Sequence, residues 1–164
     1  MRGLKTAIRV SNVLSWINMV IWGYFVLQMV LAGISTGAIL FVVFGFFLSA
    51  VVLHNYAAQQ LTKSLRDPAV PLDHQTPAGI RFIGLVALLF GVIFLGCGFI
   101  FLFYSREMLK IVQAQSPMFK EINVALVRKE GIIVMLPGLA VTVNVFLSFR
   151  LLRWYYLSKD NAVK

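Results

Sequence analysis

Charged residues are scarce in this sequence of 164 residues, and their scarcity excludes an ordinary water-soluble domain. Asp, Glu, Lys and Arg together make up 13% of the chain, whereas apolar residues make up 60%. Soluble proteins average roughly 25% charged and 45–50% apolar residues. The surplus apolar side chains, among them 14 Phe, need an apolar environment besides a protein core. The composition therefore predicts an integral membrane protein.

Cysteine and intramembrane acids are also nearly absent. Cys97 is the only cysteine, so neither an intramolecular disulfide nor a CxxC metal or redox motif can form. Ion-coupled carriers usually place a titratable carboxylate inside the membrane, and every carboxylate here lies outside the apolar runs. We therefore do not expect a coupled carrier or a small multidrug exporter. The six carboxylates are Asp67, Asp73, Glu107, Glu121, Glu130 and Asp160.

Four apolar runs are long enough to cross a bilayer, which takes about 20 residues of helix. They cover roughly residues 13–32, 37–56, 80–104 and 132–152. The first run is longer than the 7–15 apolar residues of a signal peptide, so we expect it to remain as a span. The predicted fold is all-α: a four-transmembrane-helix antiparallel bundle that forms a single integral membrane domain over residues 1–164.

The connection over residues 105–131 is too long for a simple turn, and it shows helical periodicity. Apolar residues recur on one side of residues 105–115, and Ser116-Pro117 resembles a second helix start. The pattern predicts an amphipathic helical connection between the third and fourth spans. Such helices lie in the membrane interface or bind a protein partner, and both interpretations stay open.

The 15 Lys and Arg residues predict the orientation of the spans, because cytoplasmic connections carry an excess of basic residues. Placing both termini inside puts ten of these 15 on the cytoplasmic side. We therefore expect a bacterial inner-membrane protein with cytoplasmic N- and C-termini, whose Lys and Arg contact anionic lipid headgroups. The basic residues flank apolar runs and form no basic face with interleaved aromatics, so nucleic acid is not an expected partner.

Small residues at helical spacing predict where the helices approach closely, since membrane helices associate through close backbone contact and hydrogen bonds. In the third span Gly84, Gly91 and Gly98 are seven residues apart, with Ala87 between the first two. This series keeps one face of the helix small along most of its length. The packing residues predicted in the second and fourth spans are Gly45, Ser49, Gly138 and Thr142.

A few polar residues interrupt the apolar runs. Asn18, Ser49 and Asn144 fall at a similar depth in the first, second and fourth spans, with Ser148 one turn beyond Asn144. This placement predicts an intramembrane polar layer. Two interpretations stay open: hydrogen bonds that join the helices, or a polar ligand site.

The sequence offers little catalytic or metal-binding chemistry. His54 lies near the end of the second span, where we expect an interfacial polar residue, and His74 lies in the following connection. Two histidines in these places do not make a membrane haem site, and zinc needs more ligands. The sequence contains no GxSxG, HExxH or phosphate-binding glycine loop. We predict no catalytic, cofactor-binding or metal-binding residue.

The sequence leads to three functional hypotheses, which we rank by the support that the residues give them. The first is a non-catalytic accessory, scaffolding or regulatory subunit that acts through helix–helix and loop contacts, with another membrane protein or a second copy as its partner. The second is a small oligomeric channel or uncoupled permease with a path at Asn18, Ser49 and Asn144. The third is a lipid-modifying enzyme that would use His74 and Asp73.

Overall fold

The protein is all-α. The computed structural model describes residues 2–67, 69–115 and 122–162, and these residues form five helices and no strand. Four of the five are long and apolar enough to cross a membrane, which confirms the four predicted spans. Each of the four runs for 28 to 39 residues, because polar flanking segments extend the helix beyond the apolar run. The helices are α1 (Arg2–Thr36), α2 (Ile39–Arg66), α3 (Thr76–Phe103), α4 (Ser105–Gln115) and α5 (Val124–Ala162).

Local hydrogen bonds explain where these helices begin and end. α2 ends at Arg66, and the Asp67 carboxylate then accepts a hydrogen bond from the backbone N–H of Ala69 at 3.0 Å. α3 begins at Thr76, followed by Pro77, whose missing N–H costs nothing in the first turn. At the start of α5, the Asn123 side chain accepts a hydrogen bond from the N–H of Leu126 at 2.9 Å, as an N-cap does.

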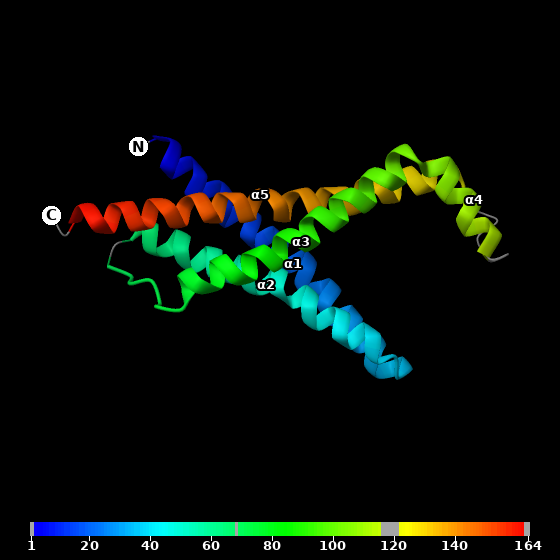
Figure 1. The fold of residues 1–164 in the computed structure, drawn as a ribbon, viewed down its shortest axis with the longest axis horizontal. Helices are drawn as coiled ribbons and strands as arrows, with labels where there is room; N and C mark the ends of the chain where they lie inside the picture. The colour runs from blue at the N-terminus through cyan, green and yellow to red at the C-terminus, as the bar shows by residue number, and fades with distance from the viewer. Residues whose placement is uncertain (1, 68, 116–121, 163–164) are drawn as a thin grey trace. The chain divides into compact units, whose positions relative to one another are not determined.

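The chain divides into two compact units. The first unit comprises Met1–Leu89 and Ala140–Lys164, and the second comprises Phe90–Leu139. The first unit therefore holds α1, α2, the beginning of α3 and the end of α5 (Figure 1). Its two chain termini and the α2–α3 connection lie at the same end, which we call the terminal end. Whether residues 1–164 act as one membrane domain stays a prediction.

In the first unit, α1 and α2 form a tight antiparallel hairpin. Its turn contains Gly37, whose φ of +68° lies in the left-handed region that glycine adopts most easily. Two further glycines bring the helices together. A Cβ on Gly33 would lie 2.5 Å from Cγ2 of Val42, and a Cβ on Gly45 would lie 3.3 Å from Cβ of Met29. The hairpin thus depends on small residues from both helices.

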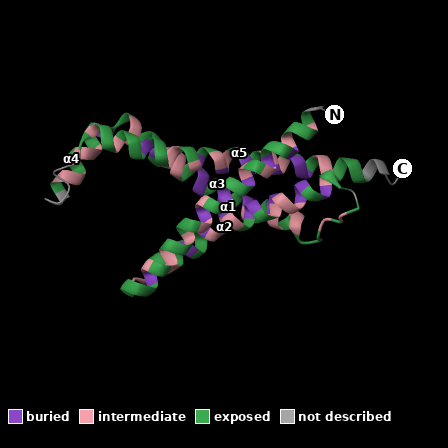
Figure 2. Cartoon of the chain, turned by 180° about the vertical axis from the view of Figure 1, so that it is seen from behind, coloured by how far each residue is buried: buried purple, intermediate pink, exposed green. Residues whose placement is uncertain are grey.

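Burial is confined to narrow stripes of each helix, as Figure 2 shows. At the terminal end of the first unit, α1, α2, α3 and α5 contribute to one apolar cluster. Much of the remaining apolar surface is open: Leu40 is 79% exposed, and Phe46 and Phe82 are each 74% exposed. Apolar exposure on this scale is what a lipid-facing surface requires. The buried members of the cluster are Ile8, Leu61, Ile80, Leu151 and Leu152.

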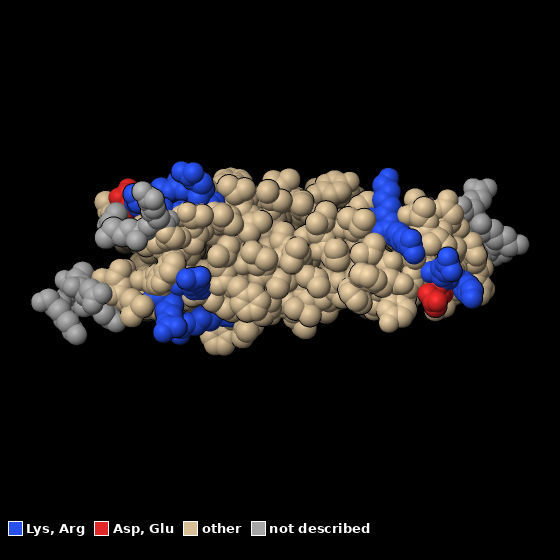
Figure 3. All heavy atoms as spheres, turned by 90° about the horizontal axis from the view of Figure 1, so that it is seen from above, with Lys and Arg blue, Asp and Glu red and all other residues tan. Residues whose placement is uncertain are grey.

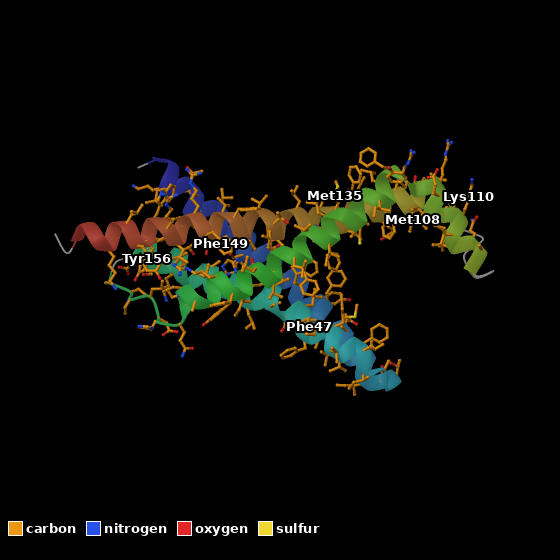
Figure 4. The ribbon with its side chains drawn as sticks, in the orientation of Figure 1. Phe47, Met108, Lys110, Met135, Phe149 and Tyr156 are labelled. Carbon is orange, nitrogen blue, oxygen red and sulfur yellow. The ribbon has the colours of Figure 1, made fainter. Side chains whose placement is uncertain are left out.

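The second unit packs the end of α3 against the beginning of α5 and adds α4. A Cβ on Gly98 would lie 2.7 Å from the carbonyl oxygen of Gly131, and a Cβ on Gly138 would lie 2.9 Å from that of Gly91. The two helices run antiparallel with backbone against backbone. α4 follows directly, and Figure 4 labels Met108 and Lys110 on it. Its bounds, Ser105–Gln115, confirm the predicted amphipathic helix between the third and fourth spans, whereas the helix start predicted at Ser116-Pro117 lies outside the described residues.

Basic side chains gather at one end of each unit in the space-filling view (Figure 3). In the first unit, Lys and Arg gather at the terminal end. In the second unit they gather around α4 and the start of α5. This pattern is typical of helices whose apolar middle lies in lipid and whose ends reach the headgroups.

Candidate functional site

A buried polar cluster occupies the interior of the first unit. It joins α1, α2 and α5 and consists of five side chains, each with no exposed surface. We call it the asparagine cluster. Helical periodicity explains how α1 contributes three residues, since positions i, i+4 and i+7 share one face. Its members are Ser11, Ser15 and Asn18 of α1, Asn55 of α2 and Asn144 of α5.

Asn144 is the centre of this cluster. Its Nδ2 donates hydrogen bonds to Oδ1 of Asn55 at 2.6 Å and to Oγ of Ser15 at 2.9 Å. Its Oδ1 accepts a hydrogen bond from Oγ of Ser11 at 3.0 Å. One carboxamide of α5 therefore binds both α1 and α2, and both of its donors are used. Groups so completely paired inside an apolar environment hold helices together.

Asn55 completes the arrangement. Its Oδ1 also accepts a hydrogen bond from Nδ2 of Asn18 at 3.3 Å, and its own Nδ2 donates to the carbonyl oxygen of Val51 at 2.6 Å. Asn55 is thus tied to its own helix on one side and to two other helices on the other. Both the oxygen and the nitrogen of this carboxamide are therefore hydrogen-bonded within the protein.

The structure brings together two of the four residues of the predicted polar layer and separates the others. Asn18 and Asn144 meet at Asn55, but Ser49 is elsewhere: its hydroxyl donates to the carbonyl oxygen of Phe46 at 2.5 Å within α2. Ser148 is buried, yet its hydroxyl donates to the backbone oxygen of Asn144 at 2.7 Å and joins no second helix. Asn55, not Ser49, is the residue of α2 that takes part.

Sequence reasoning missed Asn55, Ser11 and Ser15 because it ended the second span too early and began the first span too late. α2 continues to Arg66, so Asn55 is well inside the helix and not at its end. α1 begins before residue 13, so its two serines already lie on the helix. The spacing of Ser11, Ser15 and Asn18 was the available signal, because it marks one polar helical face.

His54 is also buried in the first unit, which corrects the expectation of an interfacial residue. It has no exposed surface, and neither ring nitrogen has a hydrogen-bond partner among the described residues. A Cβ on Gly84 would lie 3.0 Å from Cε1 and Nδ1 of the imidazole, and also 3.0 Å from Cε1 of Phe149. The glycine of α3 thus makes room for the imidazole.

The small residues predicted to pack between helices are divided between the two units. In the first unit Gly84 and Ala87 are buried, and Gly45 packs on α1. In the second unit Gly138 packs against Gly91, and Gly98 packs against Gly131, which was not predicted. Thr142 is half-buried on α5. Gly131 and Gly138 share the seven-residue spacing of the α3 series, which could have identified the pair.

Of the remaining candidates for chemistry, His54 lies apart from His74 and Asp73. His74 and Asp73 line a groove of about 360 Å³ with Arg81 and Tyr156, near the terminal end of the first unit. His54 does not line this groove. Among the described residues, no group of three or more His, Cys, Asp or Glu is placed to hold a metal ion. In the part of the chain that the structure describes, His74 and Asp73 thus share a groove without a third candidate metal ligand.

Comparisons with protein-family models, with curated proteins and with solved structures found no match to this chain.

Proposed function

We propose that this protein is a non-catalytic membrane subunit that binds a transmembrane helix of another protein. The four long apolar helices fit an integral multi-pass membrane protein. The asparagine cluster supports a structural use of the buried polar groups, because its members bind one another and are closed to the surface. The protein would act through its outer helix faces.

The groove between α2 and α3 in the first unit carries the proposal. Ser49 and Ala50 supply small side chains to a groove of about 290 Å³, and Phe46, Phe47 and Phe82 supply aromatic ones. Small residues let a neighbouring helix approach closely in lipid, where apolar burial by itself gives no driving force. Figure 4 labels Phe47 on α2. The hydroxyl of Ser49 is already bonded within α2, so it adds no polar cost to helix docking.

The orientation is part of the proposal. The termini, the α2–α3 connection and most Lys and Arg of the first unit share the terminal end. By the positive-inside tendency this end faces the cytoplasm, which for a bacterial protein places it in the inner membrane with both termini inside. The groove around Ala50 then lies within the bilayer.

The decisive experiment places a photo-cross-linking residue at position 50 of the full chain in native membranes. The matched control places it at position 20, because Val20 is 68% exposed on α1 and does not line this groove. We expect one discrete cross-linked product from position 50 and only lipid adducts from position 20. Two differently tagged copies of the chain show whether the product is a homodimer.

A cross-linked product that contains both tags would show that the groove binds a second copy of this chain and not another protein. The same pattern at both positions, or no protein adduct at position 50, would contradict helix docking in this groove. The channel alternative has no comparable support: Ser49 lies outside the asparagine cluster, whose side chains are closed off from the surface.

A further inference from the structure

A second groove lies between α3 and α5 in the first unit, close to the terminal end. It has a volume of about 450 Å³, within the roughly 300–1,000 Å³ of small-molecule sites. Its apolar lining comes from Leu85 on α3 and from Phe149, Leu152 and Leu157 on α5. The groove is separate from the Ser49–Ala50 groove and shares none of its lining residues.

Two cations and one phenol complete the lining. Arg81 of α3 and Arg153 of α5 are exposed, and the Arg81 guanidinium lies 5.5 Å from the centroid of the Tyr156 ring. The described residues that line this groove include no carboxylate. The guanidinium groups therefore keep their charge available for an anion. Arginine suits phosphate in particular, because its planar donors can form paired hydrogen bonds.

The apolar and charged side chains of this groove are arranged along the direction that crosses the membrane. Figure 4 places Phe149 and Tyr156 along α5, with Tyr156 nearer the C-terminal end. Arg81 comes one residue after the buried Ile80, and Arg153 directly follows Leu152, so both cations stand where the apolar parts of their helices end. Apolar surface followed by paired cations is complementary to an amphiphile with an anionic headgroup. A partner's apolar helix would leave both charges without a counter-charge.

The adjoining groove extends the polar end. Arg81 and Tyr156 line both grooves, and the second one adds His74, Asp73 and Lys159. A headgroup held at Arg81 can therefore reach polar side chains beyond the phosphate position. His74 and Lys159 can donate hydrogen bonds to a headgroup, and the Asp73 carboxylate can accept one from a headgroup hydroxyl, while the acyl chain stays on Leu85 and Phe149.

We propose that this groove is a specific site for one anionic glycerophospholipid of the membrane. The phosphate binds Arg81 and Arg153, and an acyl chain fills the apolar groove between α3 and α5. Tyr156 supports the position of Arg81 through its ring. This site is independent of the partner-helix groove, so either one can fail without the other.

The test uses the full chain, purified in neutral detergent and delipidated. It is titrated with phosphatidylglycerol or phosphatidylcholine in mixed micelles, and native mass spectrometry counts the bound lipid. The charge variant is Arg81→Gln with Arg153→Gln. The matched control, Lys63→Gln with Arg66→Gln, removes two exposed charges from a polar groove on α2 at the same end of the unit. A steric variant, Leu85→Trp, fills the apolar part without changing charge.

We expect one phosphatidylglycerol to bind in preference to phosphatidylcholine. The charge variant should weaken phosphatidylglycerol binding at least about tenfold and the control less than about threefold. The steric variant should also weaken it. Thermal unfolding of each variant checks that the fold is intact, and all the replaced side chains are exposed.

Three results would overturn the proposal. Equal losses in the charge variant and the control would mean attraction by net charge only. Unchanged binding in Leu85→Trp, or equal competition by soluble glycerophosphate, would mean an anion site without an acyl chain. Equal binding of phosphatidylcholine would mean that the anionic headgroup is not recognised.

Discussion

Asn144 of α5 donates a hydrogen bond of 2.6 Å to Asn55 of α2, a residue 89 positions earlier in the chain. Both side chains have no exposed surface. This contact joins the last helix to the α1–α2 hairpin by a polar bond in an otherwise apolar interior. Such bonds position helices in a membrane bundle, because a carboxamide left without a partner in lipid would be costly.

Replacing Asn144 should therefore weaken the first unit. Asn144→Leu removes three side-chain hydrogen bonds, to Ser11, Ser15 and Asn55. At about 0.6 kcal/mol each, their loss lowers the free energy of unfolding by about 2 kcal/mol. Unfolding in mixed detergent measures this change. Ser49→Ala is the control, because its hydroxyl bonds only the backbone of its own helix, and it should change stability by less than about 0.5 kcal/mol. Equal effects of the two changes would show that Asn144 does not hold the helices together.

Replacing His54 or Asn55 of α2 by leucine should change the free energy of unfolding in opposite directions. His54 is buried without a hydrogen-bond partner among the described residues, so His54→Leu removes an uncompensated polar group and should raise stability by about 1 kcal/mol. Asn55→Leu instead breaks the bonds to Asn18 and Asn144 and should lower it by about 1–2 kcal/mol. Both variants are compared by thermal unfolding in one detergent. A clear loss of stability in His54→Leu would mean that the imidazole has a stabilising partner.

In the second unit, the effect of a glycine-to-alanine replacement on stability should depend on whether that glycine contacts the other helix. In Gly98→Ala, the new Cβ would lie 2.6 Å from Cβ of Met135 and 2.7 Å from the Gly131 oxygen, so α3 and α5 must separate. We expect a loss of about 1–3 kcal/mol, as for overpacked cores. Gly96→Ala, two residues away on the same helix, has open space around its Cβ and should be neutral or slightly stabilising. Thermal unfolding distinguishes them, and equal stabilities would argue against backbone contact at Gly98.

The proposed orientation predicts which turns an impermeant reagent can reach. In a Cys97→Ser background, Ser35→Cys lies at the α1–α2 turn and Asp67→Cys lies in the α2–α3 connection, and both positions are exposed. With both termini inside, a membrane-impermeant maleimide should label position 35 in intact cells and position 67 only after lysis. Labelling of position 67 in intact cells would show that the α2–α3 connection and both termini face the outside.

Much of the fold could be predicted, because apolar run length is a local property of the chain. The periodicity of residues 105–115 marked α4, since an amphipathic face depends on nearby residues only. The candidate site was less predictable. Choosing between Ser49 and Asn55 requires the rotational position of α2 against α1 and α5, and no local signal specifies that.

The sequence by itself determined that this chain is helical, that four helices are apolar enough for a membrane, and that only a few polar residues interrupt the apolar runs. Composition and periodicity suffice for these properties. Only the tertiary structure decided that Asn55 joins Asn18 and Asn144, that Gly98 meets Gly131, and that Arg81 and Arg153 border one groove. Each of these contacts joins residues far apart in the chain. Such contacts depend on how whole helices are rotated and shifted against one another.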